Sequence, residues 1–325
     1  MTFTVDVHHH MLPDFFWQAT NEADSPVGGI APPAWSPEGA LSFLDDAGID
    51  VAVTSISTPG VHTGDDAAAR TLARRCNEYT AELVRAHPRR FAGFGCLPLP
   101  DVDGALDELA YALDDLRLDG VVVFSNARGV YLGDDRMDAL FAELQHRRAV
   151  VFIHPNASPD PSAHRLGLPD SLIDFTADTT RAVAQMLYGN KFAATPDVTY
   201  ILSHAGGTVP YLMGRFGIVD EMGVIPGGGR RDTAAATLRR LYYDTALSWG
   251  DPVLSMLRSA IGIDHVLFGT DFPYLRRDMA VGCRQRILDS SVLDKDEKRL
   301  VLAGNATRLI PRLAELAPTT PVASG

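Results

Sequence analysis

The sequence predicts an α/β protein built as a single (β/α)8 TIM barrel that spans residues 1–325. Eight short apolar runs alternate with longer amphipathic segments, the order expected of consecutive βαβ units. The composition is that of a folded chain, with 46% hydrophobic and 22% charged residues. The 325 residues exceed the roughly 250 typical of this barrel, which leaves room for a long loop and extra C-terminal helices.

The expected strands are nearly continuous apolar runs, as suits strands that are buried on both faces of a parallel sheet. They lie at residues 3–7, 51–56, 91–97, 120–124, 149–153, 198–202, 241–245 and 266–268. A doubly wound sheet is the structural alternative. No G-x-G-x-x-G motif follows any of these strands, which weakens a nucleotide-binding interpretation.

Amphipathic segments between these strands are the expected helices. They lie at residues 37–47, 65–86, 101–116, 134–148, 171–188, 208–219, 251–260 and 276–288, with a further helix at 294–303. Two long loops are expected at residues 11–36 and 223–232, and a flexible tail at 311–325. In a barrel, the loop that follows a strand lies on the catalytic face.

Charge and cysteine content restrict the partners and the compartment. Twenty-nine basic residues against 41 acidic ones give a net charge of −12, which argues against a nucleic-acid or anionic membrane surface. No apolar run reaches the length of a spanning helix, which is about 18 residues. The three cysteines form no C-x-x-C pair and are expected to be free thiols in a reducing cytoplasm.

Titratable residues gather where the expected strands end. His8 and His10 follow the first strand, and residues two apart in a strand point to the same side, so the pair has the geometry of metal ligands. A surface histidine cluster is the alternative. His154, His204 and Asp271 follow the fifth, sixth and eighth strands.

All of these strand ends meet at one mouth of a barrel, so the sequence predicts one mononuclear metal site with an acid/base group beside it. Asp244 ends the seventh strand. It is expected either to orient a metal-binding side chain without binding the metal itself, or to cap the N-terminus of the following helix.

Several motifs, in this order, resemble the amidohydrolase superfamily and its metal-dependent decarboxylase branch, typified by aminocarboxymuconate-semialdehyde decarboxylase. They are Asp6-x-His8-x-His10-x-x-Pro13, Phe152-Ile153-His154-Pro155, His204-Ala205-Gly206-Gly207, Gly269-Thr270-Asp271-Phe272-Pro273 and Gly304-Asn305-Ala306.

The resemblance implies that His8, His10, His154 and Asp271 bind one divalent metal, zinc or alternatively manganese. It also implies that His204 is the catalytic histidine. An arginine at the position of Arg215 reaches the substrate of the neighbouring subunit in that family, which implies a homodimer. A solvent-exposed helix cation is the other interpretation of Arg215.

One departure concerns the substrate. Residues 11–36 contain no Arg or Lys, although the aminocarboxymuconate enzymes carry a substrate arginine there. The chain looks closer to the 6-methylsalicylate decarboxylase type, whose substrate is an aromatic acid. Candidate substrate-binding residues are therefore Phe15, Trp17 and Tyr274, with Phe16 and Trp35 nearby. Covering the barrel rim is the alternative role of the loop aromatics.

The predicted function is the metal-dependent, non-oxidative decarboxylation of a small ortho-hydroxybenzoate. Asp271 would protonate the ring carbon with His204 relaying protons, or His204 would activate a water for attack. The alternatives are a mononuclear lactone or amide hydrolase, an aminocarboxymuconate-semialdehyde decarboxylase, and metal binding without turnover. A lysine-bridged binuclear site is excluded, since no Lys ends the fourth strand.

Overall fold

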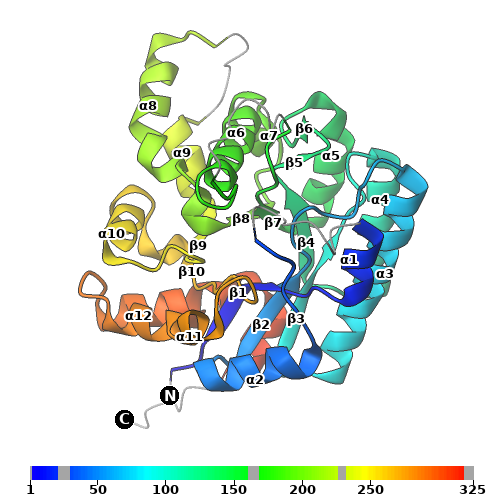
Figure 1. The fold of residues 1–325 in the computed structure, drawn as a ribbon. Helices are drawn as coiled ribbons and strands as arrows, with labels where there is room; N and C mark the ends of the chain where they lie inside the picture. Colours follow the sequence, from blue (N-terminus) through cyan, green and yellow to red (C-terminus); the bar gives the residue numbers. More distant parts are fainter. Residues whose placement is uncertain (1, 21–29, 160–167, 226–231, 318–325) are drawn as a thin grey trace.

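The computed structural model describes residues 2–20, 30–159, 168–225 and 232–317, and it confirms the predicted barrel. Eight parallel strands follow one another around the sheet in the order β1-β2-β3-β4-β7-β8-β9-β10, surrounded by helices (Figure 1). The strands are β1 (Val5–His10), β2 (Val51–Ser55), β3 (Phe91–Cys96), β4 (Gly120–Phe124), β7 (Val150–His154), β8 (Thr199–Leu202), β9 (Tyr242–Asp244) and β10 (Val266–Leu267).

The first strand extends further than its apolar run. It was expected at residues 3–7 but covers Val5–His10, because His9 and His10 pair with Thr54 and Ser55 of β2. The polar histidines therefore lie within the sheet rather than in a loop after it. Their side-chain directions are fixed by strand geometry.

The chain closes the barrel between β1 and the segment that follows β10. The amide of Val7 donates to the carbonyl of Phe268 at 2.9 Å, and the amide of His10 donates to that of Phe272 at 2.7 Å. Between them, the amide of Asp271 donates to the carbonyl of His8 at 2.9 Å. This seam brings the first strand and the segment after the last strand together at the candidate site.

Helices cover the outside of the sheet (Figure 1). They are α1 (Asp14–Thr20), α2 (Pro37–Ala47), α3 (Asp66–Ala86), α4 (Val102–Ala110), α5 (Asp138–Arg147), α6 (Asp174–Tyr188), α7 (Lys191–Ala194), α8 (Val209–Met222), α9 (Ala234–Arg239), α10 (Asp251–Ala260), α11 (Arg277–Val281), α12 (Cys283–Asp289), α13 (Lys295–Arg299), α14 (Asn305–Leu309) and α15 (Pro311–Leu316). None of these described helices is both long and apolar enough to span a membrane.

Several elements differ from the expectation. The loop predicted at residues 11–36 contains helix α1, and the helix predicted at residues 276–288 divides into α11 and α12. A short hairpin, β5 (Asn126–Ala127) with β6 (Val130–Tyr131), follows β4 and was not expected. The predicted tail begins with helix α15, which buries Leu313, while its residues 318–325 lie outside the described part of the chain.

Candidate active site

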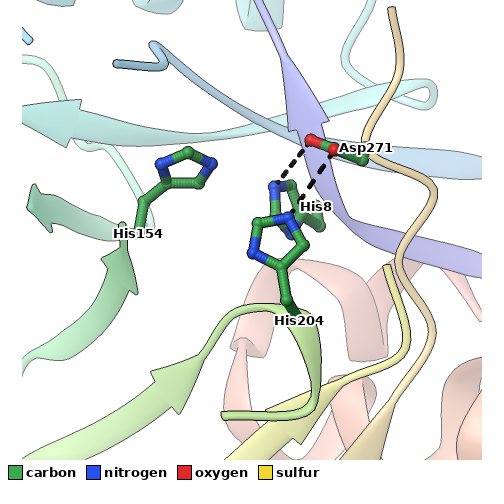
Figure 2. Close-up of side chains that lie close together, drawn as sticks. All are labelled: His8, His154, His204 and Asp271. Atoms are coloured by element: carbon green, nitrogen blue, oxygen red, sulfur yellow. Dashed lines mark ion pairs between the residues drawn. The ribbon is translucent and has the colours of Figure 1, made fainter. Parts of the chain in front are cut away.

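Four buried side chains converge at the carboxyl ends of the strands. His8 comes from β1, His154 ends β7, His204 follows β8 and Asp271 follows β10. Each offers one ligand atom, and these atoms all lie within 4.8 Å of one another (Figure 2). The side chains expected to meet at one mouth of the barrel are therefore neighbours in space.

His10 adjoins this group. Its Nε2 lies 3.1 Å from Nε2 of His8 and 3.1 Å from Oδ1 of Asp271. The other contacts of Asp271 are 3.2 Å from Oδ1 to Nε2 of His8 and 3.6 Å from Oδ2 to Nε2 of His204. Four imidazoles thus surround one carboxylate, which makes five potential ligands.

The second ring nitrogens of His8 and His154 have acceptor partners. Nδ1 of His8 donates to Oδ2 of Asp244 at 2.7 Å, and Nδ1 of His154 donates to the carbonyl of Pro155 at 2.8 Å. Because both partners accept, each Nδ1 carries a proton, and each Nε2 offers its lone pair to a metal once it carries no proton itself. This donor set of imidazoles and a carboxylate fits a divalent metal.

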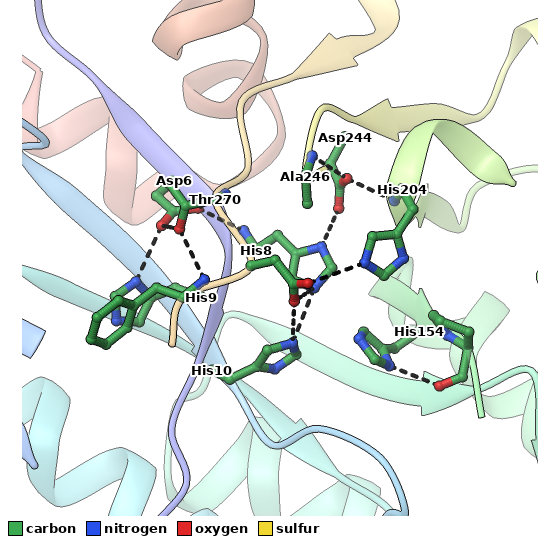
Figure 3. A network of polar contacts seen from close by, with 12 residues as sticks. Asp6, His8, His9, His10, His154, His204, Asp244, Ala246 and Thr270 are labelled. Carbon is green, nitrogen blue, oxygen red and sulfur yellow. Dashed lines mark hydrogen bonds and ion pairs between the residues drawn. The ribbon is translucent and has the colours of Figure 1, made fainter. Parts of the chain in front are cut away.

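Asp244 also holds the backbone of the turn at His204 (Figure 3). Its Oδ1 accepts from the amide of His204 at 2.8 Å and from the amide of Ala246 at 3.0 Å. Helix α10 begins at Asp251 with Gly250 as its N-cap, so Asp244 does not cap it. Of the two positions expected for Asp244, the structure has the one in which it hydrogen-bonds the second nitrogen of His8.

The charges around the site favour a cation. Burial lowers the pKa of His8, but Asp244 and Asp271 outweigh it and raise that pKa to about 10. Burial and neighbouring imidazoles lower the pKa of His10 and of His154, which keeps both rings neutral. Burial opposes ionisation of Asp271, yet His8 and the other imidazoles hold the pKa of this carboxyl well below its usual range.

The backbone is strained where His204 and Asp271 are presented. Their φ angles of 52° and 62° lie in the left-handed region, and so does the 57° of Ala205. The next two residues are glycines for steric reasons. A Cβ at Gly206 would lie 2.6 Å from the ring of Tyr243, and one at Gly207 would lie 2.2 Å from the carbonyl oxygen of Thr176.

Asp6 and Thr270 secure the seam behind His8 and Asp271, a role that the sequence reasoning did not assign to them. Oδ1 of Asp6 accepts from the amides of His8 and Thr270 at 3.1 and 3.0 Å. Oδ2 accepts from the Thr270 hydroxyl at 2.5 Å and lies 3.1 Å from Nδ1 of His9 (Figure 3). The presence of Asp6 and Thr270 inside the quoted motifs was the available signal.

A cavity of about 420 Å³ opens beside the group and includes His154, His204 and Asp271 in its wall. Apolar side chains and hydroxyls make up most of the remainder. The other described lining residues are Ile30, Ser57, Thr58, Pro169, Ser171, Leu172, Phe175, Thr176, Leu247, Ser248, Tyr274 and Leu275. No Lys or Arg occurs among these described residues, so any substrate carboxylate here needs another source of positive charge.

Of the predicted substrate-binding residues, Tyr274 alone is among the described residues that line this cavity. The ring of Phe15 instead packs on Tyr79 at 5.7 Å, with the Arg75 guanidinium 3.9 Å above it. Trp17 is buried against Phe16 at 4.9 Å. Both loop aromatics therefore act in packing within this chain, and the expected stacking at the substrate does not follow from their positions.

Arg215 lies elsewhere. It is exposed on α8 and is not among the described residues that line the cavity. Within one chain it has the position of a solvent-exposed helix cation. A role at a substrate requires a second subunit.

Comparison with known proteins agrees with the motifs. Residues 5–312 match the amidohydrolase family. The chain belongs to this family. Within it, the 6-methylsalicylic acid decarboxylase of Aspergillus aculeatus is 35% identical over 319 residues, which cover 95% of this chain and 96% of that protein.

Other amidohydrolases give the same picture. The 6-methylsalicylic acid decarboxylase of Penicillium expansum is 34% identical over 313 residues, covering 95% of this chain and 96% of that protein. The crystal structure of 5-carboxyvanillate decarboxylase from Sphingomonas paucimobilis shares the fold, with a TM-score of 0.86 at 22% identity, over 96% of this chain and 99% of that one. The resemblance to the decarboxylase branch is thereby confirmed.

Proposed function

We propose that this amidohydrolase is a metal-dependent decarboxylase of small aromatic acids, with an ortho-hydroxybenzoate such as 6-methylsalicylate as substrate. The observation that carries the proposal is the buried group of His8, His154, His204 and Asp271 in contact with the cavity. The two relatives above support the reaction type. A cavity wall without Lys or Arg among its described residues favours an aromatic monoacid over a dicarboxylate.

The metal site is proposed to consist of His8, His10, His154 and Asp271, leaving His204 free for proton transfer. We favour zinc over manganese, because zinc is commonly bound by several imidazoles and one carboxylate. A divalent metal held there supplies Lewis acidity that stabilises negative charge on substrate oxygens.

Proton transfer at Asp271 and His204 accounts for the chemistry. The low pKa of Asp271 means that this group starts as a carboxylate. It first takes the phenolic proton of the substrate and then delivers it to the ring carbon that bears the carboxylate. The bond to CO₂ breaks, its electron pair returns to the ring, and the resulting phenolate takes a proton through His204, which lines the same cavity.

The test combines metal analysis with CO₂ release. The purified protein should hold about one equivalent of divalent metal per chain and release CO₂ from 6-methylsalicylate, but not after chelation. Turnover of lactones or amides without CO₂ release would identify a hydrolase instead. Bound metal without turnover of either the aromatic acid or the lactones and amides would identify a binding protein. Either of these two results would overturn the proposal.

We further infer that the active unit is a homodimer in which Arg215 reaches the substrate of the partner subunit. Tyr211, Ile218 and Met222 are 78%, 58% and 65% exposed on α8, at spacings that place them on one helix face with Arg215. Such an apolar face with one cation suits a second copy of this chain, and a guanidinium suits a carboxylate. Three buried free cysteines agree with a reducing, cytoplasmic location.

Subunit mixing tests this shared site. Arg215→Ala should raise KM for the acid, and Arg215→Lys should restore it only in part because the ammonium lacks the bidentate fork. Mixing Arg215→Ala with His204→Asn protein should recover activity, since each heterodimer regains one complete site. Demonstrated exchange without recovered activity, or an active wild-type monomer, would contradict the shared site.

A further inference from the structure

His10 differs from His8 and His154 in the surroundings of its second ring nitrogen. Nδ1 of His10 is buried and has no hydrogen-bond partner among the described residues, whereas Asp244 and the Pro155 carbonyl accept from the other two rings. A metal-bound imidazole almost always donates its other N–H, and an unpaired buried donor costs about 1–3 kcal/mol. The surroundings of His10 should therefore contain an acceptor.

Three hydroxyls around His10 are also buried without a partner among the described residues, and they belong to Ser55, Ser57 and Tyr274. His10 and Ser55 are direct partners across β1 and β2, so their side chains project from the same face of the sheet. Ser57 follows the end of β2 by two residues and lines the cavity. The Tyr274 ring packs edge-on against His10, with ring centres 5.4 Å apart.

Burial raises the pKa of Tyr274, so its hydroxyl stays protonated and can donate. Ser55 is the hydroxyl residue paired with His10 across the two strands. A serine hydroxyl rotates freely and can accept one hydrogen bond while donating another.

We propose that Ser55 is a positioning residue: with the metal bound, its hydroxyl turns to accept the Nδ1–H of His10 and thereby directs Nε2 of His10 to the metal. Ser57 and Tyr274 line the adjoining cavity. The proposal rests on the metal site proposed above. It assigns to β2 the acceptor for His10, where Asp244 is the acceptor for His8.

The decisive experiment measures zinc affinity by competition with a chelator, together with the melting temperature of the metal-free protein. Ser55→Ala should weaken zinc binding by about 10–100-fold, the usual cost of removing a partner behind a metal ligand. The melting temperature of the metal-free protein should not fall, because that state loses only a hydroxyl without a partner. Ser57→Ala should weaken zinc binding less than Ser55→Ala does.

The matched control is Thr179→Val, which removes another buried hydroxyl without a described partner, on α6, and should leave zinc affinity unchanged. If Ser55→Ala does not fold, Ser55→Cys replaces the hydroxyl by a weaker acceptor of similar size and should show a smaller loss of the same kind. Wild-type zinc affinity in the folded Ser55 variant would overturn the proposal, as would a larger loss in Ser57→Ala. A wild-type protein that binds no metal would instead refute the metal site itself.

Discussion

The two sides of the candidate metal site are built from different chemistry. On the side of β8, β9 and β10, carboxylates accept the hydrogen bonds that position the site. Asp244 accepts from His8 and from the turn at His204, and Asp6 accepts from Thr270 beside Asp271. On the side of β2, His10 faces serine and tyrosine hydroxyls that have no described partner. Two histidines of one short motif thus have unequal supports.

The inequality has an electrostatic consequence. Two carboxylates raise the pKa of His8, so its position attracts positive charge, whereas burial and neighbouring imidazoles lower the pKa of His10. The carboxylate side therefore supplies most of the attraction for a cation, and the hydroxyl side supplies a neutral, directed lone pair. The variants below test this division.

The largest effect is expected when both histidines of β1 are removed. His8→Ala combined with His10→Ala should abolish metal binding, because it deletes two of the four proposed ligands and leaves too few for a stable site. Metal analysis of the purified double variant measures this directly. Full metal retention would show that the metal is held elsewhere.

His204→Asn should produce the next largest effect, and on turnover rather than on metal content. Removing a general acid–base group should lower kcat at least about 100-fold. The fold and most of the metal should remain, since the proposed ligands are untouched. Near-normal kcat would return His204 to a structural role, and loss of the metal would place it among the ligands.

The alternation of apolar runs and amphipathic segments was enough to predict the eight-stranded barrel, because burial on both faces leaves a readable pattern. The meeting of His8, His154, His204 and Asp271 followed from the geometry common to all barrel strand ends. The end of β1 was misplaced, since pairing with β2 holds polar residues in the strand.

Other features depend on contacts between distant segments. Phe15 and Trp17 resemble cavity residues in the sequence, yet helix α1 directs them to α3 and to the core. The position of Ser55 beside His10 becomes apparent only once the register of β1 and β2 is known. Asp6 and Asp244 have several acceptor contacts each, which no local pattern specifies.

The smallest and most discriminating change is Asp244→Asn, which compares the two supports directly. An amide has one acceptor oxygen, but Asp244 accepts from Nδ1 of His8 on one side and from the amides of His204 and Ala246 on the other. Either the amide nitrogen faces His8 and forces its proton onto Nε2, or two backbone donors lose their partner. Zinc affinity should fall about 10–100-fold, and the free energy of unfolding of the metal-free protein by about 1–3 kcal/mol.

The loss of unfolding free energy in metal-free Asp244→Asn distinguishes it from Ser55→Ala, for which the metal-free protein should keep its stability. Chelator competition for zinc and chemical denaturation of the metal-free protein, each applied to both variants, give the four numbers needed. If Asp244→Asn weakens zinc binding without destabilising the metal-free protein, the carboxylate acts only through His8, and its contacts to the turn at His204 contribute nothing to the fold. If both variants lose zinc affinity and stability equally, the two sides of the site do not differ.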